Sequence, residues 1–298
     1  MITKLIRGPI LWVTPLVALI VGVVLWPVYE MVRTSLTQVG RSGQLQGFTG
    51  LDNYVTVLAN PALMGAFVRT GIWVITVVAF TILISLFLAQ LLHEDFPGRR
   101  LVRWALLLPW AASIVMTATS FRWMLNGYYG ILNRFLLDLG FIDEPVEWLG
   151  SAETSFPWII AVGIFVSLPF TTFVILAALQ TIPQEALEAA RVDGAGAWRT
   201  YFAIVLPMLS SALVVATVIN MINVFNQFPI IWLMTQGGPG NTTDTTTTLM
   251  YKLAFRNQEI GASAALSVLN FAVILIFVLI YLRATGFMKQ KDGEVKSR

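Results

Sequence analysis

The sequence predicts an all-α membrane protein with six transmembrane helices and cytoplasmic N- and C-termini. Its 298 residues are 57% hydrophobic and 12% charged, whereas globular domains average about 45–50% apolar and about 25% charged residues. A spanning helix needs about 20 mostly apolar residues, and six stretches without Asp, Glu, Lys or Arg are long enough. They are residues 8–29, 70–92, 104–121, 154–184, 200–243 and 260–282, of which the fourth and fifth also include loop residues.

The basic residues orient these spans. With the N-terminus inside, twelve of the 19 Lys and Arg residues fall on cytoplasmic segments and seven on outer segments. Such an excess sets the orientation during insertion, so the formal net charge of +3 reflects topology and no nucleic-acid partner is expected. The first apolar run is longer than the core of about 7–15 residues in a cleaved signal peptide. It is therefore expected to be a retained span.

The residues that the sequence lacks exclude several kinds of chemistry. There is no cysteine and one histidine, His93, which leaves no disulfide, thiolate site or histidine cluster for a metal. The GxxxxGK[ST] phosphate loop is also missing, so any ATP must be bound by another polypeptide. No cofactor is expected on this chain. A membrane enzyme acting on a lipid-linked sugar is an alternative to a transporter. Its candidate acidic residues would be Asp143, Glu144 and Glu147, but these merely lie close together in one polar outer segment.

A hydrophilic segment, residues 181–206, interrupts the apolar sequence between the fourth and fifth spans. Thr181 opens the spacing of a capping box, and Gly194 lies where a C-terminal cap is expected. A second short helix is expected over residues 197–205, ended by Pro207. The segment is therefore predicted to form a helix, a glycine turn and a second helix that leads back into the membrane, which a passive channel would not explain.

The first helix of this segment is suited to docking a soluble partner. Its alanines give it a thin profile, and Glu185 and Glu188 are favoured near its positive N-terminal end. A helix lying on the membrane would instead carry a basic polar face and bulky apolar anchors, which this helix lacks. The residues expected to carry the docking are Glu185, Glu188, Ala189, Ala190, Asp193 and Gly194.

Amides in the fifth span form a candidate solute path. At about 100° per residue, Asn220, Asn223 and Gln227 lie within about 60° of one another. Polar side chains inside spans usually face a cavity or the bundle interior, where amides could bind sugar hydroxyls. They could instead join helices, at about 0.6 kcal/mol per contact. The candidates are Asn220, Asn223, Asn226, Gln227, Phe225, Phe228 and Trp232, and more weakly Ser167, Thr171, Thr172, Ser263, Ser267 and Asn270.

Three outer segments connect the spans. Residues 33–68 are expected to form a loop ending in a membrane-surface element, with a short helix opening at Pro61. Residues 123–155 carry an acidic patch, interpreted either as a solvated loop or as a docking surface for an external protein. The glycines and proline of residues 237–240 predict a sharp turn.

The hydrophilic segment also matches a known signature. Glu-Ala-Ala, three residues, Gly, nine residues, Ile, one residue and Leu-Pro run without a gap over residues 188–207. This EAA motif resembles the signature loop of permease subunits in binding-protein-dependent ABC importers. Residues 179–183 and 192–195 resemble the carbohydrate branch of that family. Residues 50–54 and 235–239 are similar to the maltose-type first permease. Residues 181–206 are called the signature loop below.

The resemblance implies a type I ABC importer permease fold, with one domain over residues 1–298, in the bacterial inner membrane. Its implied partners are a second permease, two ATPase subunits that bring ATP and Mg²⁺, an extracytoplasmic solute-binding protein and membrane lipid. The signature loop would dock in a cleft of the ATPase, with Glu188 facing a basic group and Gly194 forming the turn. Alternating access would follow from ATP-driven closure.

The implied cargo is a sugar, although similar permeases carry a polyol, a sugar derivative or glycerol 3-phosphate. Two departures from the family pattern leave the subfamily open. Arg69–Thr70 stands where relatives often have Asn-Thr, and Ser210–Ser211 stands where many have Arg-Pro.

Overall fold

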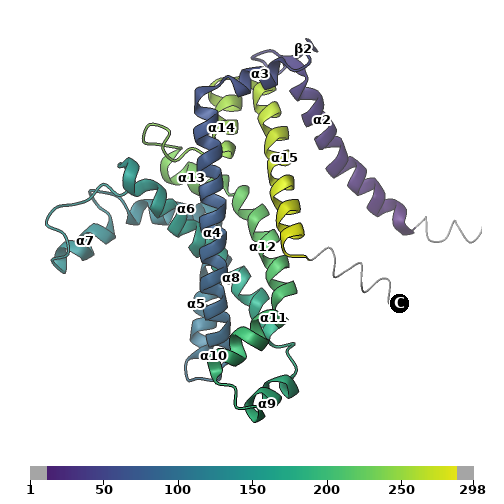
Figure 1. Ribbon diagram of the computed structural model, residues 1–298. Coiled ribbons are helices and arrows are strands. Elements are labelled where there is room, and N and C mark those ends of the chain that lie inside the picture. The colour runs from purple at the N-terminus through teal and green to yellow at the C-terminus, as the bar shows by residue number, and fades with distance from the viewer. Residues whose placement is uncertain (1–11, 287–298) are drawn as a thin grey trace, which may run out of the picture. The chain divides into compact units, whose positions relative to one another are not determined.

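The computed structural model describes residues 12–286, which are mostly helical (Figure 1). Five helical runs among the described residues are long and apolar enough to cross a membrane, in agreement with the predicted helical membrane protein. They are Trp12–Ser35, Pro61–His93, Ala152–Leu179, Ser210–Thr235 and Ile260–Ala284. The terminal basic residues used to orient the chain, Lys4, Arg7, Lys289, Lys291, Lys296 and Arg298, lie outside the described residues.

The third predicted span, residues 104–121, is not one continuous helix. It is divided between α5 (Arg99–Ala111) and α6 (Ile114–Met124), of 13 and 11 residues. The helix is interrupted because Ala112 is extended, with ψ of 143°, and because the Ser113 hydroxyl caps α6 by accepting a backbone N–H at 3.3 Å. Each helix alone is shorter than the about 20 residues of a span. The count of six spans therefore stays a prediction.

The described chain forms two compact units. The hairpin unit contains the described residues up to Leu63 and Leu249–Ala272, and the bundle unit contains Met64–Thr248 and the described residues from Val273 onward. Helices α4 (Pro61–His93) and α15 (Ile260–Ala284) contribute residues to both units. The prediction of one domain is not tested by this division.

The predicted loop of residues 33–68, which lies in the hairpin unit as far as Leu63, contains regular structure. Asn53 holds it together, because its Nδ2 donates to the carbonyl oxygens of Ser35 and Thr37, both at 3.0 Å. The expected short helix at Pro61 is wrong: Pro61 is the first residue of α4, and the Asn60 side chain accepts the Ala62 N–H at 2.9 Å. The elements are η1 (Ile20–Leu25), α2 (Trp26–Ser35), β1 (Thr37–Val39) antiparallel to β2 (Leu45–Phe48), α3 (Asp52–Leu58) and η3 (Lys252–Arg256).

The core of the bundle unit is built around Trp73 of α4, whose side chain is 1% exposed. Its Nε1–H donates to the Val224 carbonyl oxygen of α12 (Ser210–Phe225) at 2.8 Å. Its ring also lies against Gly163 of α8 (Ala152–Leu179), where an added Cβ would come within 2.4 Å of the indole. The missing side chain of Gly163 therefore lets α4 and α8 approach closely. The surrounding core includes Val77, Ala118, Ile159, Val162 and Ile230.

The second helix of the signature loop was predicted to end at Pro207, but it continues past the proline. The π-helical segment η2 (Tyr201–Val205) precedes the proline, and the Leu206 N–H bonds to the Tyr201 carbonyl oxygen. Proline lacks an N–H and its ring clashes with a regular α-helical turn, so the wider π turn accommodates it. The chain continues through α11 (Leu206–Met208) into α12.

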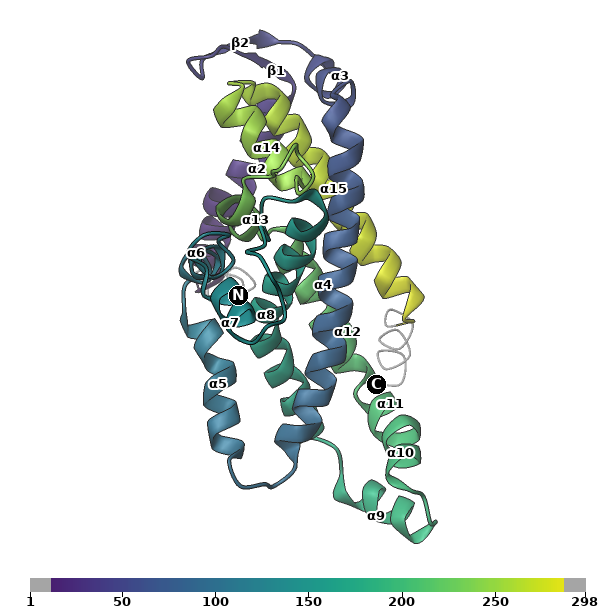
Figure 2. The ribbon, with the colours of Figure 1, turned by 90° about the vertical axis from the view of Figure 1, so that its left-hand side faces the viewer.

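Within the bundle unit, the signature loop and α13 lie toward opposite ends (Figure 1, Figure 2). Helix α13 follows a break in the fifth predicted span and packs on α6 and α8. The remaining elements are α7 (Ile131–Asp138), α9 (Gln184–Val192), α10 (Ala197–Thr200), α13 (Phe228–Thr235) and α14 (Thr246–Tyr251), the last of which extends into the hairpin unit.

Candidate functional site

The first helix of the signature loop, α9, begins without the predicted capping box. Pro183 is its N-cap residue, and no side chain caps the helix. The Thr181 hydroxyl instead donates to the Ala178 carbonyl oxygen at 2.8 Å. Thr181 lies two residues past the end of α8, and its own backbone N–H also donates to the Ala178 carbonyl oxygen, at 3.1 Å. The nearer acceptor thus decides where this hydroxyl points.

The glycine turn after α9 has the predicted geometry. Gly194 has φ of +72°, in the left-handed region. The Ala195 N–H donates to the Ala190 carbonyl oxygen at 2.9 Å, and the Gly194 N–H donates to that of Arg191 at 3.0 Å. These two bonds define a Schellman motif. The three-residue spacing between Glu-Ala-Ala and Gly thus ends α9 at a defined point.

The predicted docking residues lie mainly on the surface of α9. Glu185, Glu188, Ala189 and Asp193 are exposed, whereas Ala190 is 4% exposed and packs inward. Within residues 12–286, neither glutamate forms an ion pair. Their carboxylates are therefore available to a partner, at the end of the helix where negative charge is favoured.

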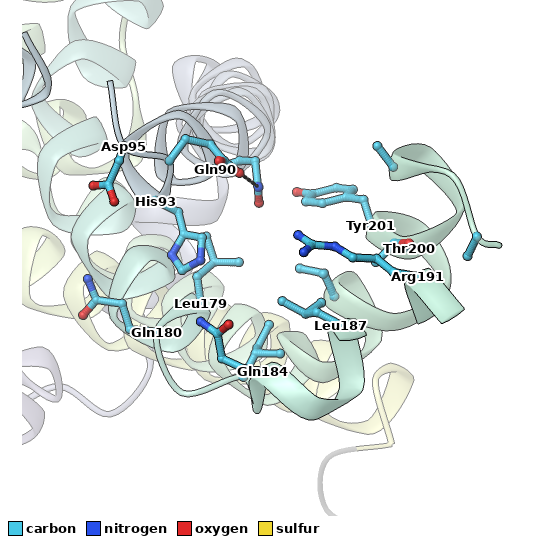
Figure 3. A pocket seen from close by; sticks show the side chains of 15 residues that line it. Gln90, His93, Asp95, Leu179, Gln180, Gln184, Leu187, Arg191, Thr200 and Tyr201 are labelled. Carbon is cyan, nitrogen blue, oxygen red and sulfur yellow. Dashed lines mark hydrogen bonds between the residues drawn. The ribbon is translucent and has the colours of Figure 1, made fainter. Parts of the chain in front are cut away.

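A cavity of about 640 Å³ lies behind α9, between the signature loop and the ends of α4 and α8 (Figure 3). Arg191 and Tyr201 project into it from the loop, and Gln90 and His93 line the side formed by α4. Burial raises the pKa of the Tyr201 phenol above its ordinary value. The cavity therefore separates α9 from the ends of α4 and α8.

The sequence-based site missed an exposed aromatic pair in the same loop. Trp198 of α10 is 78% exposed and Phe202 of η2 is 56% exposed. Their rings stack with centroids 5.9 Å apart and planes 8° from parallel. Two aromatic residues four positions apart on a helix lie on one face, and this spacing is the signal that could have revealed them.

The amides predicted to share one face of the fifth span are separated. Asn220 and Gln227 are 2% and 8% exposed, whereas Asn223 and Asn226 are on the surface. The prediction assumed one continuous helix, but α12 ends at Phe225 and Gln227 has φ of −76° and ψ of 50°. The rule of about 100° per residue therefore stops before Gln227. Its buried Oε1 has no hydrogen-bond partner among the described residues.

The buried members of the candidate path join helices. Asn220 Nδ2 donates to Thr171 Oγ1 at 2.6 Å, which connects α12 to α8. Thr172 Oγ1 donates to Ser85 Oγ at 3.1 Å, which connects α8 to α4. Thr171 also donates to the Ser167 carbonyl oxygen at 3.0 Å. These contacts match the alternative in which the polar groups hold the bundle together.

The break between α12 and α13 carries the more accessible candidates. Asn226 Nδ2 donates to the Ile222 carbonyl oxygen at 2.8 Å and so caps the end of α12. Phe228 and Trp232 stack with centroids 5.5 Å apart and planes 23° from parallel, and both are half-buried, while Phe225 is 6% exposed in the core. Asn223 thus offers an exposed amide one turn before this aromatic pair.

Three of the weaker candidates, Ser263, Ser267 and Asn270, lie in the hairpin unit. The Ser263 hydroxyl donates to the Met250 carbonyl oxygen and that of Ser267 to the Ser263 carbonyl oxygen, both at 2.9 Å. Asn270 is 6% exposed, and its Oδ1 has no partner in the described part of the chain. The two serines thus serve local structure.

Arg69 and Thr70, which stand where relatives often have Asn-Thr, form hydrogen bonds between α4 and the loop after α13. Arg69 Nε donates to the Asp244 carbonyl oxygen at 2.7 Å, and the Thr246 N–H donates to Thr70 Oγ1 at 2.9 Å. That loop begins with the predicted sharp turn, where Gly237 has φ of +86°. The substituted residue pair therefore has a structural role in this chain.

The acidic segment of residues 123–155 is an organised loop. Asn133 is 3% exposed, and its Nδ2 donates to the carbonyl oxygens of Gly127 and Val146, both at 2.9 Å. Trp148 Nε1 donates to Asn133 Oδ1 at 2.8 Å. The carboxylates Asp138, Asp143, Glu144, Glu147 and Glu153 are on its surface, and no group of three potential metal ligands occurs within residues 12–286.

Comparison with known proteins gives a family and several relatives. Residues 81–289 match the family described as "Binding-protein-dependent transport system inner membrane component". A probable ABC transporter permease of Brucella suis is 42% identical over 282 residues, covering 95% of this chain and 98% of the relative. The trehalose/maltose transport system permease MalF of Thermococcus litoralis is 33% identical over 280 residues, covering 94% of both chains. Other relatives are named as permeases for sulfoquinovosyl glycerol and sn-glycerol-3-phosphate.

A solved structure has the same fold. A bacterial ABC transporter involved in the import of the acidic polysaccharide alginate superposes with a TM-score of 0.82 at 24% identity, covering 95% of this chain and 97% of that chain.

Proposed function

We propose that this chain, which belongs to the family of binding-protein-dependent transport system inner membrane components, pairs with a second permease to form the solute path of an ATP-driven sugar importer. It is an inner-membrane ABC transporter permease, and it shares the fold of a solved importer. The observation that carries the specific role is α9, a short helix ended by the Gly194 turn, with Glu188 exposed and unpaired within the described residues.

In this proposal, α9 docks on a partner ATPase that binds ATP and Mg²⁺. Glu188 faces a basic group of that partner, and Glu185, Ala189 and Asp193 surround the contact. The exposure of these side chains supports the assignment, and truncating one partner of a desolvated charge pair costs about 2–5 kcal/mol. The Schellman turn makes α9 a defined unit, so a displacement by the ATPase is passed to η2 and α12.

The solute path in this proposal runs past the break between α12 and α13. Asn223, Asn226 and the Phe228–Trp232 pair offer amide and ring surfaces. Hydroxyl-rich solutes suit such groups, because amides both donate and accept hydrogen bonds. Gln227 and Phe225 are buried next to this break, whereas Asn220, Thr171 and Thr172 position the helices through the contacts described above.

The membrane arrangement follows from the same proposal. Helices α5 and α6 would cross the bilayer in succession as the third of six spans, with both termini and the signature loop in the cytoplasm. A solute-binding protein would deliver the cargo from the other side, where the acidic loop held by Asn133 offers a surface. The positive-inside bias of the sequence supports this orientation.

The proposed cargo is a sugar, and the alternatives are a polyol, a sugar derivative or glycerol 3-phosphate. Relatives named for trehalose/maltose and for sn-glycerol-3-phosphate support this range. The neighbouring reading frames should encode a second permease and a solute-binding protein. Their absence would argue against the assembly.

Reconstitution tests the proposal directly. The chain, the second permease, the ATPase and the binding protein are assembled in vesicles, and uptake of labelled maltose, trehalose and glycerol 3-phosphate is measured with and without ATP. Uptake of one solute that requires ATP, the binding protein and this chain is the expected result. Equal uptake after this chain is omitted would overturn the proposal.

A further inference from the structure

The helical run of residues 197–205 in the signature loop has two different faces. Thr200, Tyr201 and Val205 line the cavity behind α9 (Figure 3). Trp198, Arg199 and Phe202 are exposed on the surface instead. The stacked rings of Trp198 and Phe202 therefore form an apolar surface that this chain does not cover within its described residues.

This surface lies where the chain changes from polar to apolar sequence. Arg199 is the last Asp, Glu, Lys or Arg before residues 200–243, and residues 202–209 are all apolar. Phe202 precedes the candidate span Ser210–Thr235 by about 12 Å along a helix axis. Tryptophan and other amphipathic aromatic residues concentrate at such membrane–water boundaries.

We propose that Trp198, Arg199 and Phe202 insert into the headgroup region of the bilayer on the side of the signature loop and anchor the loop to the lipid surface. The rings would lie at the boundary with the acyl chains, and Arg199 would contact anionic phosphates. The negative surface potential of the cytoplasmic leaflet contributes about 1 kcal/mol per basic residue near it. The sidedness and the effect on coupling rest on the proposed function, whereas the lipid contact does not.

Charge separation within the loop favours lipid over the ATPase as the occupant of this surface. The docking helix α9 is acidic near its start, with Glu185 and Glu188, and suits a basic protein groove. The second helix carries Arg199 between two exposed aromatic residues, as interfacial helices do. The sequence of α9 does not fit a helix that lies on the membrane surface. The second helix of the loop, residues 197–205, does fit one.

An anchor at this position has a mechanical consequence. A partner that displaces α9 would turn it about residues 198–202 instead of sliding the whole loop along the membrane. The cavity of about 640 Å³ behind α9 provides space for such a turn. The motion would then enter α12 through η2 and α11, which follow the anchor without a break in the helical run.

Spin labels test the lipid contact, because the chain has no cysteine and each new cysteine is its unique attachment site. Trp198→Cys and the control Val192→Cys, whose parent side chain is 88% exposed in the same loop, are labelled on the purified chain before the importer is assembled in vesicles with anionic lipid. Accessibility to oxygen, which concentrates in lipid, is compared with accessibility to a water-soluble nickel chelate. The label at residue 198 should favour oxygen several-fold, with or without the ATPase, and that at residue 192 should favour nickel.

Other outcomes overturn the anchor. A label at residue 198 that is nickel-accessible alone and becomes protected when the ATPase binds would assign the surface to the ATPase. A label protected from both reagents without the ATPase would assign it to the second permease.

A functional variant addresses the mechanical role separately. Trp198→Ser should lower solute transported per ATP hydrolysed at least twofold, and Trp198→Phe should restore it. An unchanged ratio in Trp198→Ser would overturn the mechanical role. Because lipid accessibility is measured independently of uptake, an unlabelled complex that fails to transport would contradict the proposed function without contradicting the anchor.

Discussion

The indole of Trp73 in α4 lies against the bare Cα of Gly163 in α8, so closely that a Cβ on Gly163 would come within 2.4 Å of the ring. The same indole donates its N–H to the Val224 carbonyl oxygen of α12 at 2.8 Å. One side chain therefore sets the spacing of three helices that are distant in sequence. The hydrogen bonds of Asn220 and Thr172 join the same three helices.

Gly163→Ala should destabilise the bundle, because the added methyl group must displace the Trp73 ring. Overpacking of this kind costs about 1–3 kcal/mol. Thermal unfolding of the purified permease should shift to lower temperature. Gly71→Ala, in α4, is the matched control, since its added Cβ would meet nothing within 4 Å. Equal shifts for the two variants would contradict the role of the Trp73–Gly163 contact.

Gly194→Ala should weaken the end of α9, because its φ of +72° is in the left-handed region. That conformation costs a non-glycine residue about 1–2 kcal/mol. Hydrogen exchange of the Ala195 amide, which donates to the Ala190 carbonyl oxygen, should become about tenfold faster. Gly196→Ala should leave exchange unchanged, since Gly196 has φ of −69° and open space around it. Similar exchange in both variants would argue against a strained turn.

Glu188→Lys should leave membrane insertion intact and abolish ATP-dependent uptake, because it places a positive charge where a basic group of the ATPase is proposed. Co-purification of the ATPase with the permease pair and uptake in vesicles are the two measurements. Glu144→Lys makes the same charge change at an exposed position in the acidic loop and should retain the ATPase. Normal uptake by Glu188→Lys would remove the coupling assignment.

Asn223→Leu and Asn220→Leu should have different effects although both remove an amide from α12. Asn220 bonds to Thr171 at 2.6 Å, so its loss should lower stability by about 0.6–1.7 kcal/mol. Asn223 is exposed, so its loss should change the KM or rate of transport and leave thermal unfolding nearly unchanged. Unchanged transport by Asn223→Leu would remove it from the proposed path.

Local sequence patterns predicted well where the structure depends on neighbouring residues. The Gly194 turn follows from spacing alone, because a Schellman motif is closed within six residues. The same reasoning failed at Thr181, where the end of α8 offered a competing acceptor, the Ala178 carbonyl oxygen. It also failed at Gln227, because the end of α12 at Phe225 interrupts the helical periodicity.

The sequence by itself determined that this is a membrane protein, because long apolar stretches without charge have to be removed from water. It also determined that ATP must be bound by another chain, because folding cannot supply a phosphate loop that the sequence lacks. It also placed α9 and its exposed glutamates. Only the tertiary structure decided which polar side chains join helices and which face outward, since residues such as Asn220 and Asn223 are chemically identical and differ in the neighbours that packing brings to them. The same holds for Trp198, whose exposure depends on which face of its helix turns toward the cavity.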